Sequence, residues 1–314
     1  MSKMKSRSDC ITITVDKARA VLVLRPLYEA FVNQRQLFAH ISREVHAPQR
    51  RFFPEGVQEG GLDHRRWLFF AAMTDRREVS WRVYESHARL WVKEQKLYSE
   101  HVLGMSSIGI AKLLAGENIG SPAQSARYWP RSAETLFGSF GGDPLSMYQQ
   151  FGSVQEILAF KKRGGSLPGF GPKILSLLAM FYAELGLMVM PLDAFPVDVH
   201  VQRFAISTGV IMAEVPLVNE QVESALRPLL CEICIEEGWN PLLLSHAIWF
   251  LGNQCCSGCY RNRAVEFLCP SYEMCGGSIS TLTYFRRGTW DMTAPRHNKG
   301  GQRNFVLSSA PLFL

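Results

Sequence analysis

The sequence predicts an all-α protein, because its apolar residues recur with the period of a helix in nearly every patterned segment. Alternation of the kind that marks a strand is scarce beyond residues 11–15. Several segments also carry the residues that start and end helices. The chain has 314 residues, 47% of them hydrophobic and 20% charged, so it can bury one large core or two ordinary ones and is not composed like a disordered chain.

Apolar periodicity alone predicts five of the helices. They cover approximately residues 17–43, 66–72, 79–92, 132–140 and 220–235. Clusters of Gly, Pro and Asp predict the loops between helices. These clusters occupy residues 54–63, 116–122 and 141–144.

Three further helices are predicted from their ends. Ser153, with a glutamate three residues later, forms a capping box for a helix that runs to about residue 162. Pro172 stands where the first residue of the next helix belongs, and Gly186 closes that helix. Pro241 starts another helix, which ends at Gly252.

Charge and hydropathy indicate whether the protein could bind a polyanion, be secreted or cross a membrane. The net charge is +6, yet residues 191–275 are acidic while the rest of the chain is basic, so one face could hold a polyanion. The basic N-terminus is not followed by an apolar segment, which argues against a secretory signal. The most apolar run, residues 174–192, is interrupted by Glu184 and closed by Pro191, so we expect a buried helix, no membrane span and a soluble protein.

The sharpest local motif is KKRGGSLPGFGPK, residues 161–173. It predicts a helical hairpin in which the amides of Gly169 and Gly171 lack partners within a helix, and such amides at a helix N-terminus bind phosphate. Lys161, Lys162 and Arg163 would add a salt-dependent attraction for DNA. The simpler alternative is a plain connection between two helices.

Two residues could carry chemistry: Lys173, which ends this motif, and Asp198, which lies further along the chain. Lys173, at the start of the second helix, could act as an amine nucleophile toward a sugar carbon and form a Schiff base, although most such lysines are exposed cations. Asp198, within the segment PVDVH, lies near a predicted helix N-terminus. Its carboxylate could remove a proton or stabilise an oxocarbenium charge, or it could simply cap the helix.

The cysteines are clustered toward the C-terminus. Cys255, Cys256, Cys259, Cys269 and Cys275 lie close together in the sequence. Clustered thiols in a chain without an export signal favour a metal site over a disulfide framework.

Taken together, LPGFGPK at 167–173, PVDVH at 196–200 and the cysteine cluster resemble the helix-hairpin-helix DNA glycosylase superfamily, in particular endonuclease III. PVDVH is also similar to the form of this motif in 8-oxoguanine glycosylases. Weaker similarity lies at residues 74–80, 128–133, 219–223 and 245–252, so that the resemblance covers about residues 67–275.

The resemblance implies a two-lobed all-α fold with a C-terminal four-cysteine metal-cluster loop. Residues 67–190 would form the helical barrel domain with the hairpin, and residues 191–275 the lobe with the catalytic aspartate and the cysteine cluster. Residues 1–66 would supply N-terminal helices packed on the cluster lobe. Residues 276–314, which contain Gly pairs and no helical period, would be a C-terminal extension.

The resemblance also implies an activity. Lys173 would be the Schiff-base nucleophile and Asp198 the essential acid of a bifunctional DNA glycosylase with AP lyase activity, which removes an oxidised base from double-stranded DNA. Such chemistry requires the damaged nucleotide to be flipped out of the duplex. The cysteine cluster favours an oxidised pyrimidine as the excised base, whereas PVDVH favours an oxidised purine. The resemblance therefore does not decide between the two. The alternatives are a monofunctional glycosylase and a non-catalytic DNA-binding iron–sulfur protein.

The resemblance assigns the DNA contacts to the hairpin and to the cluster loop. We expect a monomer that works at the nucleoid in the cytoplasm of a bacterium or archaeon, or in the nucleus of a eukaryote. The residues expected to contact DNA are Lys161, Lys162, Arg163, Leu167, Gly169, Phe170, Gly171, Arg261 and Arg263.

The expected ligands of a 4Fe-4S cluster are Cys256, Cys259, Cys269 and Cys275, with Cys255 as an alternative to Cys256. Zinc bound by four cysteines is the competing possibility. The spacing C-x2-C-x9-C-x5-C departs from the family's C-x6-C-x2-C-x5-C.

A second departure from the family lies between the two catalytic candidates. Lys173 and Asp198 are 25 positions apart, more than in the family. An extra helical turn or a longer loop, within about residues 185–195, must absorb the difference.

Overall fold

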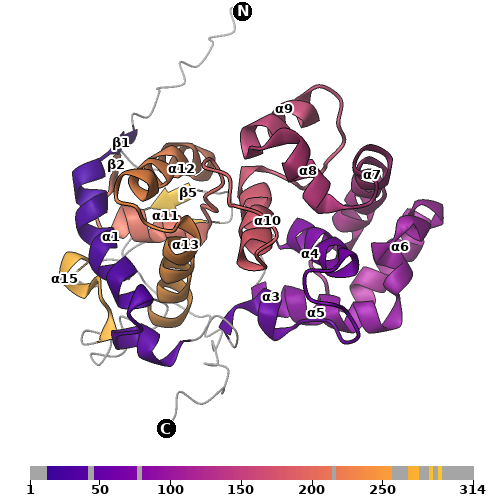
Figure 1. The fold of residues 1–314 in the computed structure, drawn as a ribbon, viewed down its shortest axis with the longest axis horizontal. Coiled ribbons are helices and arrows are strands. Elements are labelled where there is room, and N and C mark those ends of the chain that lie inside the picture. The colour runs from indigo at the N-terminus through magenta and orange to yellow at the C-terminus, as the bar shows by residue number, and fades with distance from the viewer. Residues whose placement is uncertain are drawn as a thin grey trace, which may run out of the picture. The chain divides into compact units, whose positions relative to one another are not determined.

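The computed structural model describes residues 13–41, 46–75, 80–213, 217–256, 268–275, 283–285 and 289–291. Helices predominate in it (Figure 1), so the all-α prediction is confirmed. The chain divides into two compact units. The cluster unit takes in the described residues of Met1–His40, Val197–Ile233 and His246–Leu314, and the hairpin unit those of Ile41–Pro196 and Cys234–Ser245.

The hairpin unit is built around one buried helix. α4 (Leu62–Thr74) packs against α5, α7, α8 and α10, and its residues Trp67, Phe69 and Phe70 are almost wholly buried. Phe70 stacks on Trp129 with ring centroids 4.6 Å apart. The surrounding elements are α3 (Pro48–Arg51), α5 (Ser80–Lys93), η2 (Gln95–Tyr98), η3 (Glu100–Gly104), α6 (Ser107–Gly116), α7 (Pro122–Phe140), α8 (Pro144–Phe151), α9 (Val154–Lys162) and α10 (Pro172–Glu184).

The cluster unit combines helices with two small antiparallel sheets. Strand β1 (Ile13–Val15) pairs with β2 (Ile211–Ala213), and the order of the other sheet is β3 (Leu217–Val218), β5 (Thr289–Asp291), β4 (Thr283–Phe285). Its helical elements are α1 (Lys17–Val32), η1 (Gln36–His40), α11 (Val199–Ser207) and α15 (Tyr272–Cys275). α12 (Asn219–Glu236) and α13 (Pro241–Phe250) contribute residues to both units, and α13 continues into a π-helical turn, η4 (Leu251–Cys255).

Helices with clear end signals are predicted best. α9, α10 and α13 begin where predicted, and the Ser153 hydroxyl accepts the amide of Glu156 at 3.1 Å. α1 was predicted to reach residue 43 but ends at Val32, because Gln34 and Gln36 adopt left-handed φ angles of 51°. α7 starts ten residues before its predicted start, and the short helices α6 and α8 were not predicted.

The division between the units also differs from the sequence-based one. The hairpin unit begins at residue 41 instead of 67. The reason is that α3 packs against α5, while the Gln49 amide donates to the Glu184 carboxylate of α10 at 2.8 Å. The C-terminal extension adds to the cluster unit the strands β4 and β5, with a fully buried Trp290.

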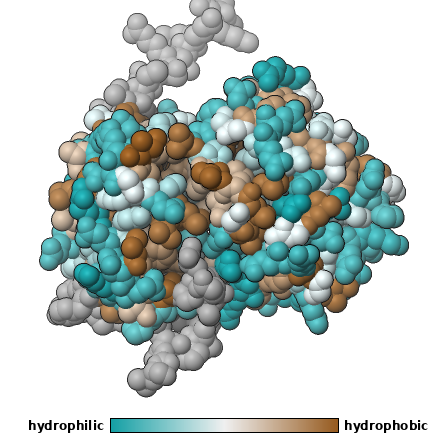
Figure 2. Space-filling model, in the orientation of Figure 1, coloured by the Kyte–Doolittle hydropathy of each residue, from teal (hydrophilic) through white to brown (hydrophobic). Residues whose placement is uncertain are grey.

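Exposed large hydrophobic side chains are spread over many elements, and the face drawn in Figure 2 shows hydrophobic residues interspersed with hydrophilic ones. Among the described residues, no helix has both the length and the apolar character needed to cross a bilayer.

A buried polar relay fixes the C-terminal end of α4. His87 lies in the core, where its Nε2 is 2.8 Å from the Thr74 hydroxyl and its Nδ1 is 2.8 Å from the Tyr98 hydroxyl. Burial lowers the pKa of His87 to about 3. His64, also buried, has a pKa lowered to about 4 by burial and by the neighbouring Arg50 and Arg65.

We expect the free energy of unfolding to fall as the pH is lowered from about 6.5. Histidine in the unfolded chain takes up a proton near that pH, whereas folded His87 stays neutral until about pH 3. The contribution of neutral His87 to the free energy of unfolding is therefore fully present above pH 6.5 and is lost as the pH falls from 6.5 toward 3. One such histidine contributes at most about 1.4 kcal/mol per pH unit. Urea unfolding measured at several pH values between 5 and 7 gives the free energy of unfolding at each pH. This free energy should change less steeply with pH in His87→Phe than in the wild type. An identical pH dependence in the two proteins would contradict this explanation.

Candidate functional site

The turn between α9 and α10 is held from inside through its carbonyl groups. Lys161 Nζ donates to the Phe170 carbonyl at 2.8 Å, and the Ser132 hydroxyl of α7 donates to the Pro168 carbonyl at 3.2 Å. Thr135 of α7 donates to a third carbonyl of the turn at 2.7 Å. Lys161 was expected to contact DNA, but its ammonium group stabilises the hairpin itself.

The amides of Gly169 and Gly171 therefore point outward from this turn. In a trans peptide the N–H group points opposite to the C=O group. The Gly169 amide shares its peptide with the Pro168 carbonyl, and the Gly171 amide shares its peptide with the Phe170 carbonyl. Neither amide donates a hydrogen bond to any described residue. Gly171 also caps α10 without a side-chain hydrogen bond, so the first-turn amides add to an arrangement suited to an anion such as phosphate.

The other residues of the turn divide into core and surface. Gly169 has a φ angle of 93°, which favours glycine. Leu167 and Phe170 were expected to contact DNA, but both side chains are buried, and Phe170 stacks on Phe69 at 4.3 Å. Only their backbone could reach a ligand. Lys162 and Arg163 are exposed and fit the expected role of attracting a polyanion.

Lys173 is a positioned amine. It is the second residue of α10, half-buried, and its Nζ lies 3.4 Å from the main-chain carbonyl of Asp75 at the end of α4. The Asp75 carboxylate is buried and accepts the Ser80 hydroxyl at 3.2 Å. The relay through Thr74 and His87 holds the same end of α4. Lys173 therefore follows Gly171 by two positions in the chain and has a main-chain partner at the end of α4, which distinguishes it from an ordinary exposed lysine.

Asp198 is the N-cap of α11. Its Oδ1 accepts the amides of His200 at 2.9 Å and Val201 at 3.0 Å. Its Oδ2 accepts no hydrogen bond from a described residue, so capping leaves one carboxylate oxygen for a ligand. Capping and chemistry are thus compatible. Lys173 belongs to the hairpin unit and Asp198 to the cluster unit.

The cysteine segment packs against the helix that Asp198 begins. A Cβ at Gly252 would lie 2.6 Å from the Cβ of His200, so only glycine allows η4 to approach α11 this closely. Two residues after His200 in α11, Gln202 accepts the indole N–H of Trp290 at 2.9 Å. The position of Asp198 in its unit thus depends on η4 and on the C-terminal extension.

Cys255, the expected alternative to Cys256 as a ligand, lies next to Cys269. A hydrogen bond from the Cys255 thiol lowers the pKa of Cys269. Cys255 is buried and Cys256 half-buried, because successive residues of the turn face different sides. Cys275 is in α15, while Cys259, Arg261 and Arg263 lie outside the described residues.

These thiols form a donor set of the right chemistry for iron–sulfur or zinc. The thiols of Cys255 and Cys269 lie next to each other, and a shared metal site requires such convergence. Within the described residues, no three metal-binding side chains form a group, but one of the four expected ligands falls outside them. Two further cysteines, the half-buried Cys231 and the buried Cys234, belong to α12.

A loop absorbs the long interval between Lys173 and Asp198. α10 ends at Glu184, so residues 185–196 form a loop instead of an extra helical turn. Asp193 in this loop accepts the amides of Val154 and Gln155 at the start of α9. Neither this contact nor the one between Lys173 and Asp75 has a signal in the sequence, because each joins residues far apart in the chain.

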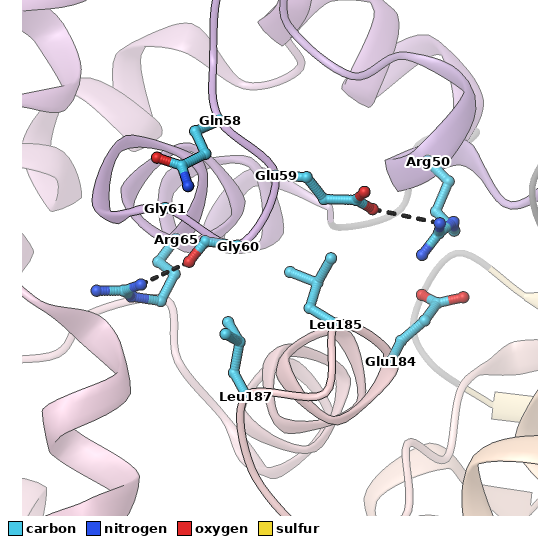
Figure 3. Close-up of a pocket in the computed structure, with 9 residues that line it drawn as sticks. All are labelled: Arg50, Gln58, Glu59, Gly60, Gly61, Arg65, Glu184, Leu185 and Leu187. Carbon is cyan, nitrogen blue, oxygen red and sulfur yellow. Dashed lines mark hydrogen bonds and ion pairs between the residues drawn. The ribbon is translucent and has the colours of Figure 1, made fainter.

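A pocket of about 670 Å³ lies elsewhere in the hairpin unit (Figure 3). Both of its arginines are already in ion pairs, since Arg50 pairs with Glu59 of the pocket at 3.2 Å and Arg65 with Asp143 outside it at 2.7 Å. None of the predicted site residues lines it. The lining residues are Arg50, Gln58, Glu59, Gly60, Gly61, Arg65, Glu184, Leu185 and Leu187.

No protein-family model matches the chain, and no curated protein matches it.

Proposed function

We propose that the protein excises an oxidised base from double-stranded DNA and then nicks the strand, with Lys173 as the nucleophile. The observation that carries the proposal is the hairpin. Its outward amides at Gly169 and Gly171 suit a phosphate, and the half-buried amine of Lys173 follows two positions after Gly171. A backbone phosphate bound there would bring the adjoining sugar within reach of Lys173.

The proposed reaction begins with a flipped-out nucleotide. The neutral amine of Lys173 forms a bond to C1′ while the bond from C1′ to the base breaks, and the base leaves with a proton. The C1′–O4′ bond of the sugar then breaks, with O4′ taking up a proton from water, and leaves a protonated Schiff base between Lys173 and C1′. Loss of a C2′ proton then expels the 3′ phosphate, which cuts the strand and leaves an unsaturated Schiff base on Lys173, until water hydrolyses it to the free amine and an unsaturated aldehyde.

Asp198 is proposed to assist these steps through its remaining oxygen. An ionised carboxylate at a helix N-terminus is stabilised by the helix dipole. It can take the proton that the lysine must lose and stabilise positive charge that develops on the sugar. In this proposal the two units are the two lobes of a helix-hairpin-helix glycosylase.

The metal site is proposed to have a structural role. Cys255, Cys259, Cys269 and Cys275 would hold a 4Fe-4S cluster, or zinc in its place, which stabilises the fold when bound. Because η4 carries Cys255 and packs on α11 through Gly252 and His200, the residues of this segment would keep Asp198 in place.

The direct test is a panel of duplexes carrying thymine glycol, 8-oxoguanine or an abasic site, incubated with and without borohydride. The proposal expects nicking and, with borohydride, a covalent protein–DNA adduct for at least one damaged base and for the abasic site. Base release without nicking would indicate a monofunctional glycosylase. Binding without any reaction would indicate a non-catalytic DNA-binding protein and overturn the proposal.

Asp198→Asn separates capping from chemistry. Asparagine caps helices as well as aspartate does, so α11 and the thermal stability should be retained. Without the negative charge, single-turnover excision should slow by about a hundredfold or more while binding to damaged duplex stays unchanged. Undiminished excision by this variant would remove Asp198 from the mechanism.

A further inference from the structure

Asp193 joins the loop before Asp198 to the first helix of the hairpin. Its Oδ1 accepts the amide of Val154 at 3.0 Å and its Oδ2 accepts the amide of Gln155 at 2.8 Å. Both carboxylate oxygens are thus used on the first two amides of α9, where the helix dipole favours a negative charge. The partners lie 39 and 38 positions away in the chain, so this is a tertiary contact.

The residues between this contact and Asp198 are tightly packed. Ala194, Phe195 and Val197 are each no more than 1% exposed. The Ala194 amide also donates to the Pro191 carbonyl at 2.9 Å, which closes a turn around Asp193. A loop of this length without regular structure would ordinarily be mobile, but here one end is held by α10 and the other by the Asp193 carboxylate and by buried side chains.

We infer that Asp193 is a positioning residue for Asp198, which limits where the catalytic carboxylate can lie. The inference rests on the proposed function. Only five positions separate the two aspartates, so a fixed Asp193 restricts the start of α11. Misplacing a catalytic group by about 1 Å can cost about a hundredfold in rate, which makes such a restraint valuable.

The chain supplies a matched control at the same helix end. Ser153 caps the third amide of α9, that of Glu156, but it is not part of the loop that leads to Asp198. Asp193→Ala and Ser153→Ala each remove one cap of α9. Only Asp193→Ala releases the loop.

Single-turnover excision and binding to a duplex with a tetrahydrofuran abasic analogue distinguish the two roles. We expect Asp193→Ala to lower the excision rate by about tenfold or more with unchanged affinity, and Ser153→Ala to change neither by more than about twofold. Asp193→Asn, which can still accept one amide, should fall between Asp193→Ala and the wild type. Equal losses in the two alanine variants, or no loss in Asp193→Ala, would overturn the inference.

Hydrogen exchange tests the inference without any excision activity. The amides of His200 and Val201 report the Asp198 cap, because both donate to its Oδ1. Asp193→Ala should speed their exchange, whereas Ser153→Ala should not. If Asp193→Ala does not fold, Asp193→Asn gives the same comparison. Faster exchange in a protein that cleaves no lesion would sustain the restraint while rejecting the proposed function, and unchanged exchange would reject the restraint itself.

Discussion

Lys173→Gln should abolish the borohydride adduct and lower strand nicking by about a thousandfold or more. A primary amine is the only group of this side chain that can form a Schiff base, and glutamine has none. The fold should survive, because the glutamine amide can still donate toward the Asp75 carbonyl, which Lys173 Nζ approaches at 3.4 Å. The measurement is gel analysis of a duplex with an abasic site, with and without borohydride.

Lys162→Gln is the matched control for that experiment. Lys162 is an exposed lysine at the end of α9, so its replacement removes the same charge from the other side of the hairpin. It should weaken binding to DNA and reduce the salt dependence, yet leave a full yield of adduct at saturating protein. A Lys173→Gln protein that forms as much adduct as Lys162→Gln would show that another amine reacts.

Cys255→Ser should lose the proposed metal, whereas Cys256→Ser should keep it. The reason is that the Cys255 thiol contacts Cys269 and is buried, whereas Cys256 is half-buried. For a 4Fe-4S cluster, anaerobically purified wild type and Cys256→Ser should be brown with about four irons per chain, and Cys255→Ser should have far fewer. Metal analysis and the visible spectrum measure both.

Cys234→Ser controls for the cost of placing a hydroxyl in a buried position, since Cys234 is buried in α12. It should retain the metal. Metal loss from Cys256→Ser with full retention in Cys255→Ser would reverse the ligand assignment. One zinc in a colourless protein would exclude the cluster and leave the cysteine comparison to identify the zinc ligands.

The sequence predicts the parts of this fold that depend on neighbouring residues. The capping box at Ser153, Pro172 at the start of α10 and Asp198 near the start of α11 all act within one helical turn, and the structure has each where expected. The end of α1 was missed because it depends on two glutamines with left-handed backbone angles, a conformation that glutamine rarely adopts.

Tertiary contacts account for the remaining differences. Phe170 looks like a turn residue by its neighbours, yet packing on Phe69 makes it part of the core. Cys255 and Cys256 are equivalent by composition, and only the direction that each faces from η4 distinguishes them. The contact of Asp193 with α9 and that of Lys173 with Asp75 join segments that are distant in the sequence, so no local sequence pattern predicts them.

Identification of the cross-linked residue tests the central claim most directly. The wild-type protein is treated with borohydride on a duplex carrying an abasic site, the adduct is digested with protease and nuclease, and the modified peptide is sequenced by mass spectrometry. The account predicts one major modified residue, Lys173, carrying the reduced sugar remnant. A modification at the N-terminal amine or at another lysine, with Lys173 unmodified, would contradict it.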